Sequence, residues 1–254
     1  MAGRFFVGRP WNNGRSHRHA ATSMNAPPHP IDLVVFDCDG VLVDSERITS
    51  RVFADMLREL GADVDGHELA EQCVGRSTAD SLSMAVERLG RPLPPDFERR
   101  YGERSRAALA EEVTLMPGVA AMIDAIELPC AIASNGLRMK MAITLRVTGL
   151  LPRFDGRWFG IDDVERGKPA PDLYLLAASA FDARPRHCVV VEDSPTGIAA
   201  GRAAGMTVLG YAVSLPPERL LDAGAHYVFD DMAHLPALLD ALHRAVPLAP
   251  AEAD

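Results

Sequence analysis

Short apolar segments alternate with helical segments through much of this chain, and that alternation limits its fold more than any other feature. The segments whose apolar and branched residues predict strands are 31–36, 130–133, 157–159, 187–191, 206–210 and 227–229. Strands that alternate with helices are joined by right-handed crossovers, which give a parallel sheet with helices on both faces. The predicted fold is an α/β, doubly wound parallel sheet of the Rossmann-like kind.

One long block interrupts the alternation directly after the first predicted strand. Apolar residues recur at every fourth position from Ile48 onward, and Gly61 ends this segment, as expected of an amphipathic helix. Further helical patterns follow, and the block contains no convincing strand. We therefore expect a helical cap at residues 46–115, inserted into a core made of residues 31–45 and 116–245.

The composition excludes several classes of partner. The net charge of −9 argues against nucleic acid, whose phosphates need a basic surface, but allows a small phosphorylated metabolite. No apolar run approaches the ~20 residues of a membrane span. The four cysteines show no C-x-x-C spacing, which indicates reduced thiols in a cytoplasmic protein. Residues 1–30 contain four prolines and no acidic residue, so we expect a disordered N-terminal tail.

Polar residues follow three of the predicted strands at the point where each ends. These residues are Asp37 and Asp39, then Ser134 and Asn135, then Glu192 and Asp193. An aspartate at a strand end is often only a turn residue, because its side chain bonds to nearby backbone. Ligands of open parallel sheets, however, bind at the carboxyl ends of the strands. The convergence of these residues there, together with the loop lysine Lys168, favours a functional site.

Asp37 and Asp39 are two residues apart, so on a continuing strand both carboxylates would project from one face. Adjacent anions repel each other unless a cation or a proton neutralises one of them. Mg²⁺ prefers oxygen ligands, and the carboxylates available to it are those of Asp37, Glu192 and Asp193. The groups suited to phosphate oxygens belong to Ser134, Asn135 and Lys168. This inventory predicts phosphoryl chemistry.

Four motifs occur in order between about Ile31 and Phe229. They are Asp37-Cys38-Asp39-Gly40-Val41, Ala133-Ser134-Asn135-Gly136, Lys168-Pro169-Ala170-Pro171-Asp172 and Val191-Glu192-Asp193-Ser194. With this set, the chain resembles the haloacid dehalogenase superfamily of phosphotransferases, in the β-phosphoglucomutase-like and sugar-phosphatase branch with a helical cap.

The resemblance implies a role for each motif residue. Asp37 would be the nucleophile that forms an aspartyl-phosphate, and Asp39 the general acid and base. The implied metal residues are Asp37, Asp39 through its backbone carbonyl, Asp193 and, assisting, Glu192. Ser134 and Lys168 would bind the transferring phosphoryl group. In the cap, Gly75, Arg76 and Ser77 resemble the loop that faces the substrate.

Two alternatives stay open beside a Mg²⁺-dependent phosphatase of a sugar or sugar-acid phosphate. A β-phosphoglucomutase would carry a histidine in the first cap helix and an arginine after the cap-loop glycine, where this chain has Thr49 and Thr78. A phospho-accepting signalling module would place its acceptor aspartate on a later strand and would lack the helical insertion. A cap over the site is compatible with a monomer.

Overall fold

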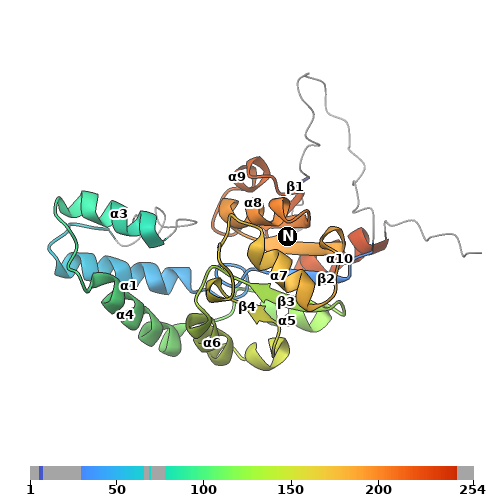
Figure 1. The fold of residues 1–254 in the computed structure, drawn as a ribbon, viewed down its shortest axis with the longest axis horizontal. Helices are drawn as coiled ribbons and strands as arrows, with labels where there is room; N and C mark the ends of the chain where they lie inside the picture. Colours follow the sequence, from blue (N-terminus) through green and yellow to red (C-terminus); the bar gives the residue numbers. More distant parts are fainter. Residues whose placement is uncertain (1–5, 8–29, 66–68, 70–77, 245–254) are drawn as a thin grey trace, which may run out of the picture.

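The computed structural model describes residues 6–7, 30–65, 69 and 78–244. Within these residues, seven strands form one sheet of order β1-β7-β6-β5-β2-β3-β4 (Figure 1). The strands are β1 (Phe6–Val7), β2 (Leu33–Phe36), β3 (Cys130–Ala133), β4 (Trp158–Phe159), β5 (Cys188–Glu192), β6 (Thr207–Tyr211) and β7 (Tyr227–Phe229). Strands β2 to β7 pair in parallel, as predicted.

The short strand β1 was not predicted. Phe6–Val7 falls in the segment expected to be a disordered tail, and it pairs antiparallel with β7. Residues 1–5 and 8–29 lie outside the described residues, so the expected disorder there stays a prediction.

The two faces of the sheet bury alternate residues of each strand. Val34 and Phe36 of β2 face one core, whereas Leu33 and Val35 face the other, because successive side chains of a strand point to opposite faces. The first face is covered by α5 (Val119–Ala125), α6 (Arg138–Val147) and α10 (Leu235–Arg244). The second is covered by α7 (Asp172–Ala180), α8 (Pro195–Ala203) and α9 (Pro217–Asp222). The doubly wound fold is confirmed.

Short 3₁₀ turns complete the connections of this core. They are η1 (Leu151–Phe154), η2 (Ile161–Asp163), η3 (Pro185–His187) and η4 (Met232–His234). No helix in the described ranges is both long and apolar enough to cross a membrane.

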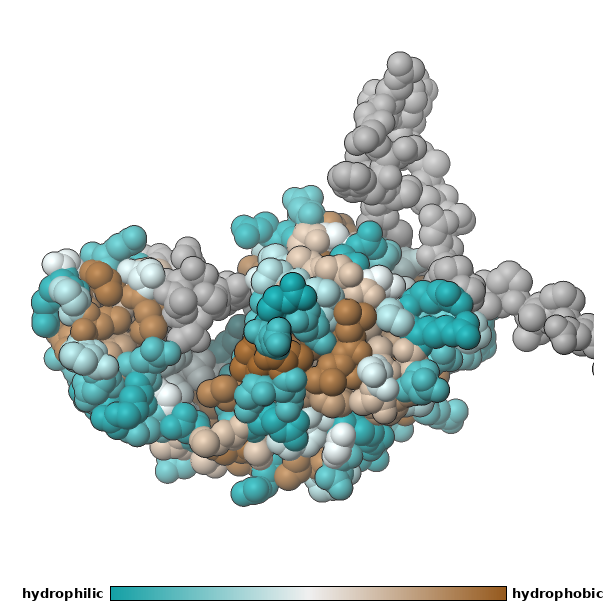
Figure 2. Space-filling model, viewed as in Figure 1, coloured by the Kyte–Doolittle hydropathy of each residue, from teal (hydrophilic) through white to brown (hydrophobic). Residues whose placement is uncertain are grey.

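Of the described helices that lie between β2 and β3 in the sequence, all but α5 form a separate lobe at one end of the molecule (Figure 1). They are α1 (Glu46–Glu59), α3 (Thr78–Leu89) and α4 (Phe97–Glu112). The contact between α1 and α4 includes aromatic rings: Phe53 of α1 meets Phe97 and Tyr101 of α4 edge-on, at centroid distances of 5.9 and 5.2 Å. The lower part of this lobe, where α4 lies, is hydrophilic (Figure 2), and exposed ion pairs such as Arg104–Glu59 join α4 to α1.

The two chain segments that join this lobe to the sheet run side by side. The Asp44 N–H donates to the carbonyl of Thr114, and the Met116 N–H donates to that of Leu42, both at 3.0 Å. These bonds bring the start of α1 close to the acids that follow β2. The cap boundaries drawn at residues 46 and 115 stay a prediction.

Candidate active site

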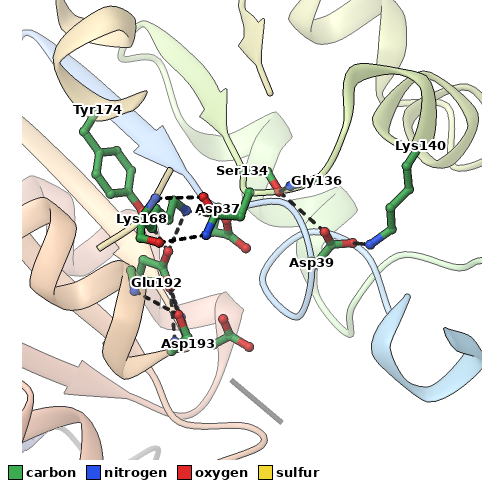
Figure 3. A network of polar contacts seen from close by, with 12 residues as sticks. Asp37, Asp39, Ser134, Gly136, Lys140, Lys168, Tyr174, Glu192 and Asp193 are labelled. Carbon is green, nitrogen blue, oxygen red and sulfur yellow. Dashed lines mark hydrogen bonds and ion pairs between the residues drawn. The ribbon is translucent and has the colours of Figure 1, made fainter. Parts of the chain in front are cut away.

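The two aspartates of the first motif lie just beyond the end of β2. The strand ends at Phe36, so Asp37 and Asp39 are not on a continuing strand, and the argument for one shared face does not apply. The Asp37 N–H donates to the carbonyl of Val191 at 2.9 Å, which fixes it beside β5. Gly40 has a φ of 78°, so the chain turns directly after Asp39. Each aspartate has its own partners (Figure 3).

Lys168 neutralises the part of the site that contains Asp37. Its Nζ lies 2.5 Å from Oδ1 of Asp37 and 2.7 Å from Oε1 of Glu192, and its side chain is only 3% exposed. Burial lowers the pKa of Lys168, but the two carboxylates outweigh burial and hold that pKa well above its ordinary value. Burial raises the pKa of Asp37 to about 7, because the attraction of Lys168 only partly offsets the loss of water.

Glu192, the last residue of β5, has partners on both carboxylate oxygens. Oε1 accepts from Lys168 and, at 2.8 Å, from the hydroxyl of Tyr174. Oε2 accepts from the N–H groups of Asp193 and Ser194 at 3.1 Å each, and from the Ser194 hydroxyl at 2.9 Å. Glu192 therefore holds Lys168 and the turn after β5 in place.

Asp193 is a buried carboxylate with no ion pair to any residue that the structure describes. The residue is 5% exposed, and within the described part of the chain its carboxylate has no hydrogen bond or ion pair. It lies against the turn of the first motif, since a Cβ added to Gly40 would fall 2.1 Å from its Oδ2. Burial, and then the charges of nearby carboxylates such as Glu192, raise the pKa of Asp193 well above its ordinary value. A divalent cation would supply the missing charge.

The oxygen donors around Asp37 and Asp193 are of the kind that Mg²⁺ prefers. Asp37 and Asp193 offer hard oxygen ligands, and the backbone carbonyl of Asp39 belongs to the same turn. Among the described residues, no three His, Cys, Asp or Glu side chains converge as a closed metal cage. Waters and a substrate oxygen would therefore complete the shell, as is usual for Mg²⁺.

The second motif places a hydroxyl and an amide at the end of β3. Ser134 is 1% exposed, and its Oγ accepts from the Gly136 N–H at 3.0 Å and lies 3.4 Å from Oδ2 of Asp39. The Asn135 side chain instead pairs with the backbone of Lys168, accepting from its N–H at 2.8 Å and donating to its carbonyl at 3.1 Å. Ser134 thus faces the acids, while Asn135 fixes the loop that carries the lysine.

Asp39 has two further partners that the sequence did not predict. Its Oδ1 accepts from Nζ of Lys140 at 2.7 Å and from the hydroxyl of Ser45 (Figure 3 shows the lysine). Burial raises the pKa of Asp39, but the charge and hydrogen bond of Lys140 and the bond from Ser45 together lower it below its ordinary value. Near them, burial, followed by the charge of Asp39, raises the pKa of Glu46 to about 7.

Lys140, Tyr174 and Ser45 were missed because helices or helix starts, rather than strand ends, carry them. One signal could have identified Lys140: of the 26 lysine and arginine residues, only Lys140 and Lys168 are lysines.

The predicted cap residues Gly75, Arg76 and Ser77 lie outside the described residues. Thr49, at the position where a mutase would carry histidine, hydrogen-bonds within its own helix, to the carbonyls of Ser45 and Glu46 at 3.2 Å each.

The chain is similar to a known family and to named phosphatases. A family model described as haloacid dehalogenase-like hydrolase matches residues 31–205, more than half of the chain. The 6-phosphogluconate phosphatase of Escherichia coli (strain K12) is 31% identical over 82% of this chain and 94% of its own length. Hexitol phosphatase A of the same organism is 31% identical over 72% of this chain and 83% of its own length.

A solved structure supports the same assignment. The chain is similar to a HAD family hydrolase of Deinococcus radiodurans R1 with bound phosphate and sodium, with a TM-score of 0.73 and 36% identity. That match covers 86% of this chain and 99% of the other. The resemblance drawn from the four motifs is confirmed: this chain is an enzyme that belongs to the haloacid dehalogenase-like hydrolase family.

Proposed function

We propose that this phosphatase hydrolyses a small phosphate monoester with Mg²⁺, through a covalent aspartyl-phosphate on Asp37. One observation carries the proposal: Lys168 pairs with Asp37, and the carboxylate of Asp193 lies close enough to feel the charge of Asp37, so a phosphate dianion would meet the charge of the lysine and that of a bound cation. Ser134, which is 1% exposed, offers a hydroxyl 3.4 Å from Oδ2 of Asp39.

The reaction would proceed in two displacements. In the first, a carboxylate oxygen of Asp37 forms a bond to phosphorus while the bond to the leaving oxygen breaks, and Asp39 gives that oxygen a proton. In the second, a water oxygen bonds to phosphorus, the bond to Asp37 breaks, and Asp39 accepts the proton of the water. Inorganic phosphate leaves, and both aspartates return to their first state.

The surroundings of Asp39 favour one of its two roles over the other. Lys140 and Ser45 favour the ionised form of Asp39, which is the form that accepts the proton of the water. The first step requires that Asp39 carry a proton when the substrate is bound. Mg²⁺, when bound, cancels charge between Asp37 and the phosphate and orients the displacement.

The substrate class that has most support is a sugar or sugar-acid phosphate. The named relatives act on 6-phosphogluconate and on hexitol phosphates, and they are matched over most of their length. The cap would close over the substrate and exclude bulk water.

The test is phosphate release from a panel of monoesters, with Mg²⁺ and with EDTA, by wild type and Asp37→Asn. The panel contains 6-phosphogluconate, hexitol phosphates, phosphoglycolate and β-glucose 1-phosphate. Mg²⁺-dependent release that disappears in Asp37→Asn supports the proposal. Conversion of β-glucose 1-phosphate to glucose 6-phosphate with a bisphosphate primer, without phosphate release, would instead identify a mutase.

A further inference from the structure

The two lysines of this chain both contact the acids of the active site. All the remaining residues among the 26 lysines and arginines are arginines, although either type can serve as an exposed cation. Lys168 pairs with Asp37, and Lys140 pairs with Asp39. An ammonium is a compact point charge on a flexible stem, whereas a guanidinium is a wide planar fork. Both ammonium groups of the chain thus lie against the acids of the site.

The two oxygens of Asp39 lie in different surroundings. Oδ1 accepts from both Nζ of Lys140, at 2.7 Å, and the hydroxyl of Ser45. Oδ2 faces the other way, 3.4 Å from Oγ of Ser134. One oxygen is thus anchored, and the other faces the hydroxyl at the end of β3 and the space where the phosphoryl group would lie.

The two donors to Oδ1 of Asp39, Lys140 and Ser45, come from different lobes of the molecule. Lys140 projects from α6 of the core, on which the cap helix α4 packs. Ser45 immediately precedes α1, the first cap helix, and its side chain makes no capping hydrogen bond to that helix. The side chains of Lys140 and Asp39 are 26% and 19% exposed, so water competes less for this pair than for a surface pair.

We propose that Lys140 is a positioning residue for the second displacement: with Ser45 it holds Oδ1 of Asp39, so that Oδ2 accepts the proton of the attacking water. This inference rests on the proposed function. In the step concerned, the water oxygen bonds to phosphorus, the bond between phosphorus and Asp37 breaks, and the proton moves to Oδ2. Lys140 touches neither the water nor the phosphoryl group in this arrangement.

The experiment uses p-nitrophenyl phosphate with Mg²⁺, because this leaving group departs without help from an acid. Lys140→Met keeps an unbranched side chain, one atom shorter, but removes the charge and the hydrogen-bond donor. We expect kcat to fall about 10- to 100-fold, since misplacing a catalytic group by about 1 Å can cost that much. KM should fall in parallel, so that kcat/KM changes little. A rapid burst of one nitrophenolate per enzyme should appear, with phosphoenzyme trapped by acid quench.

Three variants make the result specific. Arg146→Met removes a cation from an exposed position of the same helix and should show no burst. Ser45→Ala removes the other donor to Oδ1 and should give a smaller burst, which keeps the test usable if Lys140→Met does not fold. In an Asp39→Asn background, Lys140→Met should lower kcat no further, because Lys140 acts only through Asp39.

Other results would overturn the inference. A rise in KM with unchanged kcat would mean that Lys140 binds the substrate directly, and unchanged kinetics would mean that it positions nothing. Failure of the proposed function looks different: wild-type enzyme would then release no phosphate with Mg²⁺ from p-nitrophenyl phosphate or from the monoester panel.

Discussion

The Nζ atom of Lys168 lies 2.5 Å from Oδ1 of Asp37, in a position where only 3% of the lysine side chain is exposed. Removing one partner of a buried pair leaves an uncompensated charge, which costs about 3–5 kcal/mol. We expect Lys168→Met to lower the free energy of unfolding by about that amount at pH 8, measured by urea denaturation without metal. At pH 6 the loss should be smaller, because burial raises the pKa of Asp37 to about 7 and the carboxyl then takes up a proton.

A matched control lies two residues away. Arg166 pairs with Asp172 at 2.8 Å, but its side chain is 70% exposed. Because solvent screens such a pair, Arg166→Met should change the unfolding free energy little at either pH. Equal losses in both variants would contradict the buried-pair account.

The roles proposed for Asp37 and Asp39 should be separable by the leaving group of the substrate. Asp37→Asn removes the nucleophile and should reduce the turnover of every monoester to background. Asp39→Asn should lower kcat/KM for an alkyl phosphate by about 10²–10⁴, the usual contribution of a general acid, but much less for p-nitrophenyl phosphate. Circular dichroism should show both variants folded. Equal losses on the two substrates would remove Asp39 from the acid role.

The sequence was sufficient to predict the parallel strands β2 to β7, though not β1, because their residues are mostly apolar. Val34 and Phe36 pack on one face and Leu33 and Val35 on the other, so a run apolar throughout predicts a strand buried on both sides. Strand ends then located the acids, because the parallel strands all present their carboxyl ends at one edge of the sheet.

The sequence could not predict which carboxylate oxygens would have hydrogen-bond partners. Glu192 and Asp193 are neighbours of similar chemistry, yet Glu192 has partners on both oxygens and Asp193 has none within the described residues. Lys140 was missed for a related reason: its distance to Asp39 depends on how α6 packs against the turn after β2. Such distances depend on tertiary packing, which periodicity does not encode.

Mg²⁺ should stabilise the protein more at pH 8 than at pH 6. Without metal, burial raises the pKa of Asp37 to about 7 and that of Asp193 well above its ordinary value, so the folded state holds protons that the unfolded state has released. The stability of the metal-free protein therefore falls as the pH rises from the unfolded pKa values through the folded ones. At pH 8 Asp37 has lost its proton and a bound cation can take the place of that proton, whereas at pH 6 the cation must displace it.

The measurement is the Tm in EDTA and in excess Mg²⁺ at both pH values. Asp193→Asn, which has no carboxylate to titrate at that position, should show a smaller Mg²⁺ effect and a weaker dependence on pH. An equal Mg²⁺ shift in wild type and Asp193→Asn would place the cation elsewhere.

Alanine substitutions at Gly40 and Gly61 can test the geometry of the proposed metal site, with Gly61 as the control. Both have positive φ, 78° and 88°, so alanine at either position strains the backbone by about 1–2 kcal/mol. Only at Gly40 would the new Cβ also meet the site, 2.1 Å from Oδ2 of Asp193, whereas at Gly61 nothing lies within 4 Å. Gly40→Ala should therefore weaken Mg²⁺ activation strongly, and Gly61→Ala should cost stability alone. Titrating activity against Mg²⁺ in both variants separates the two effects: if Gly40→Ala kept wild-type Mg²⁺ dependence, Asp193 would not hold the cation beside this turn.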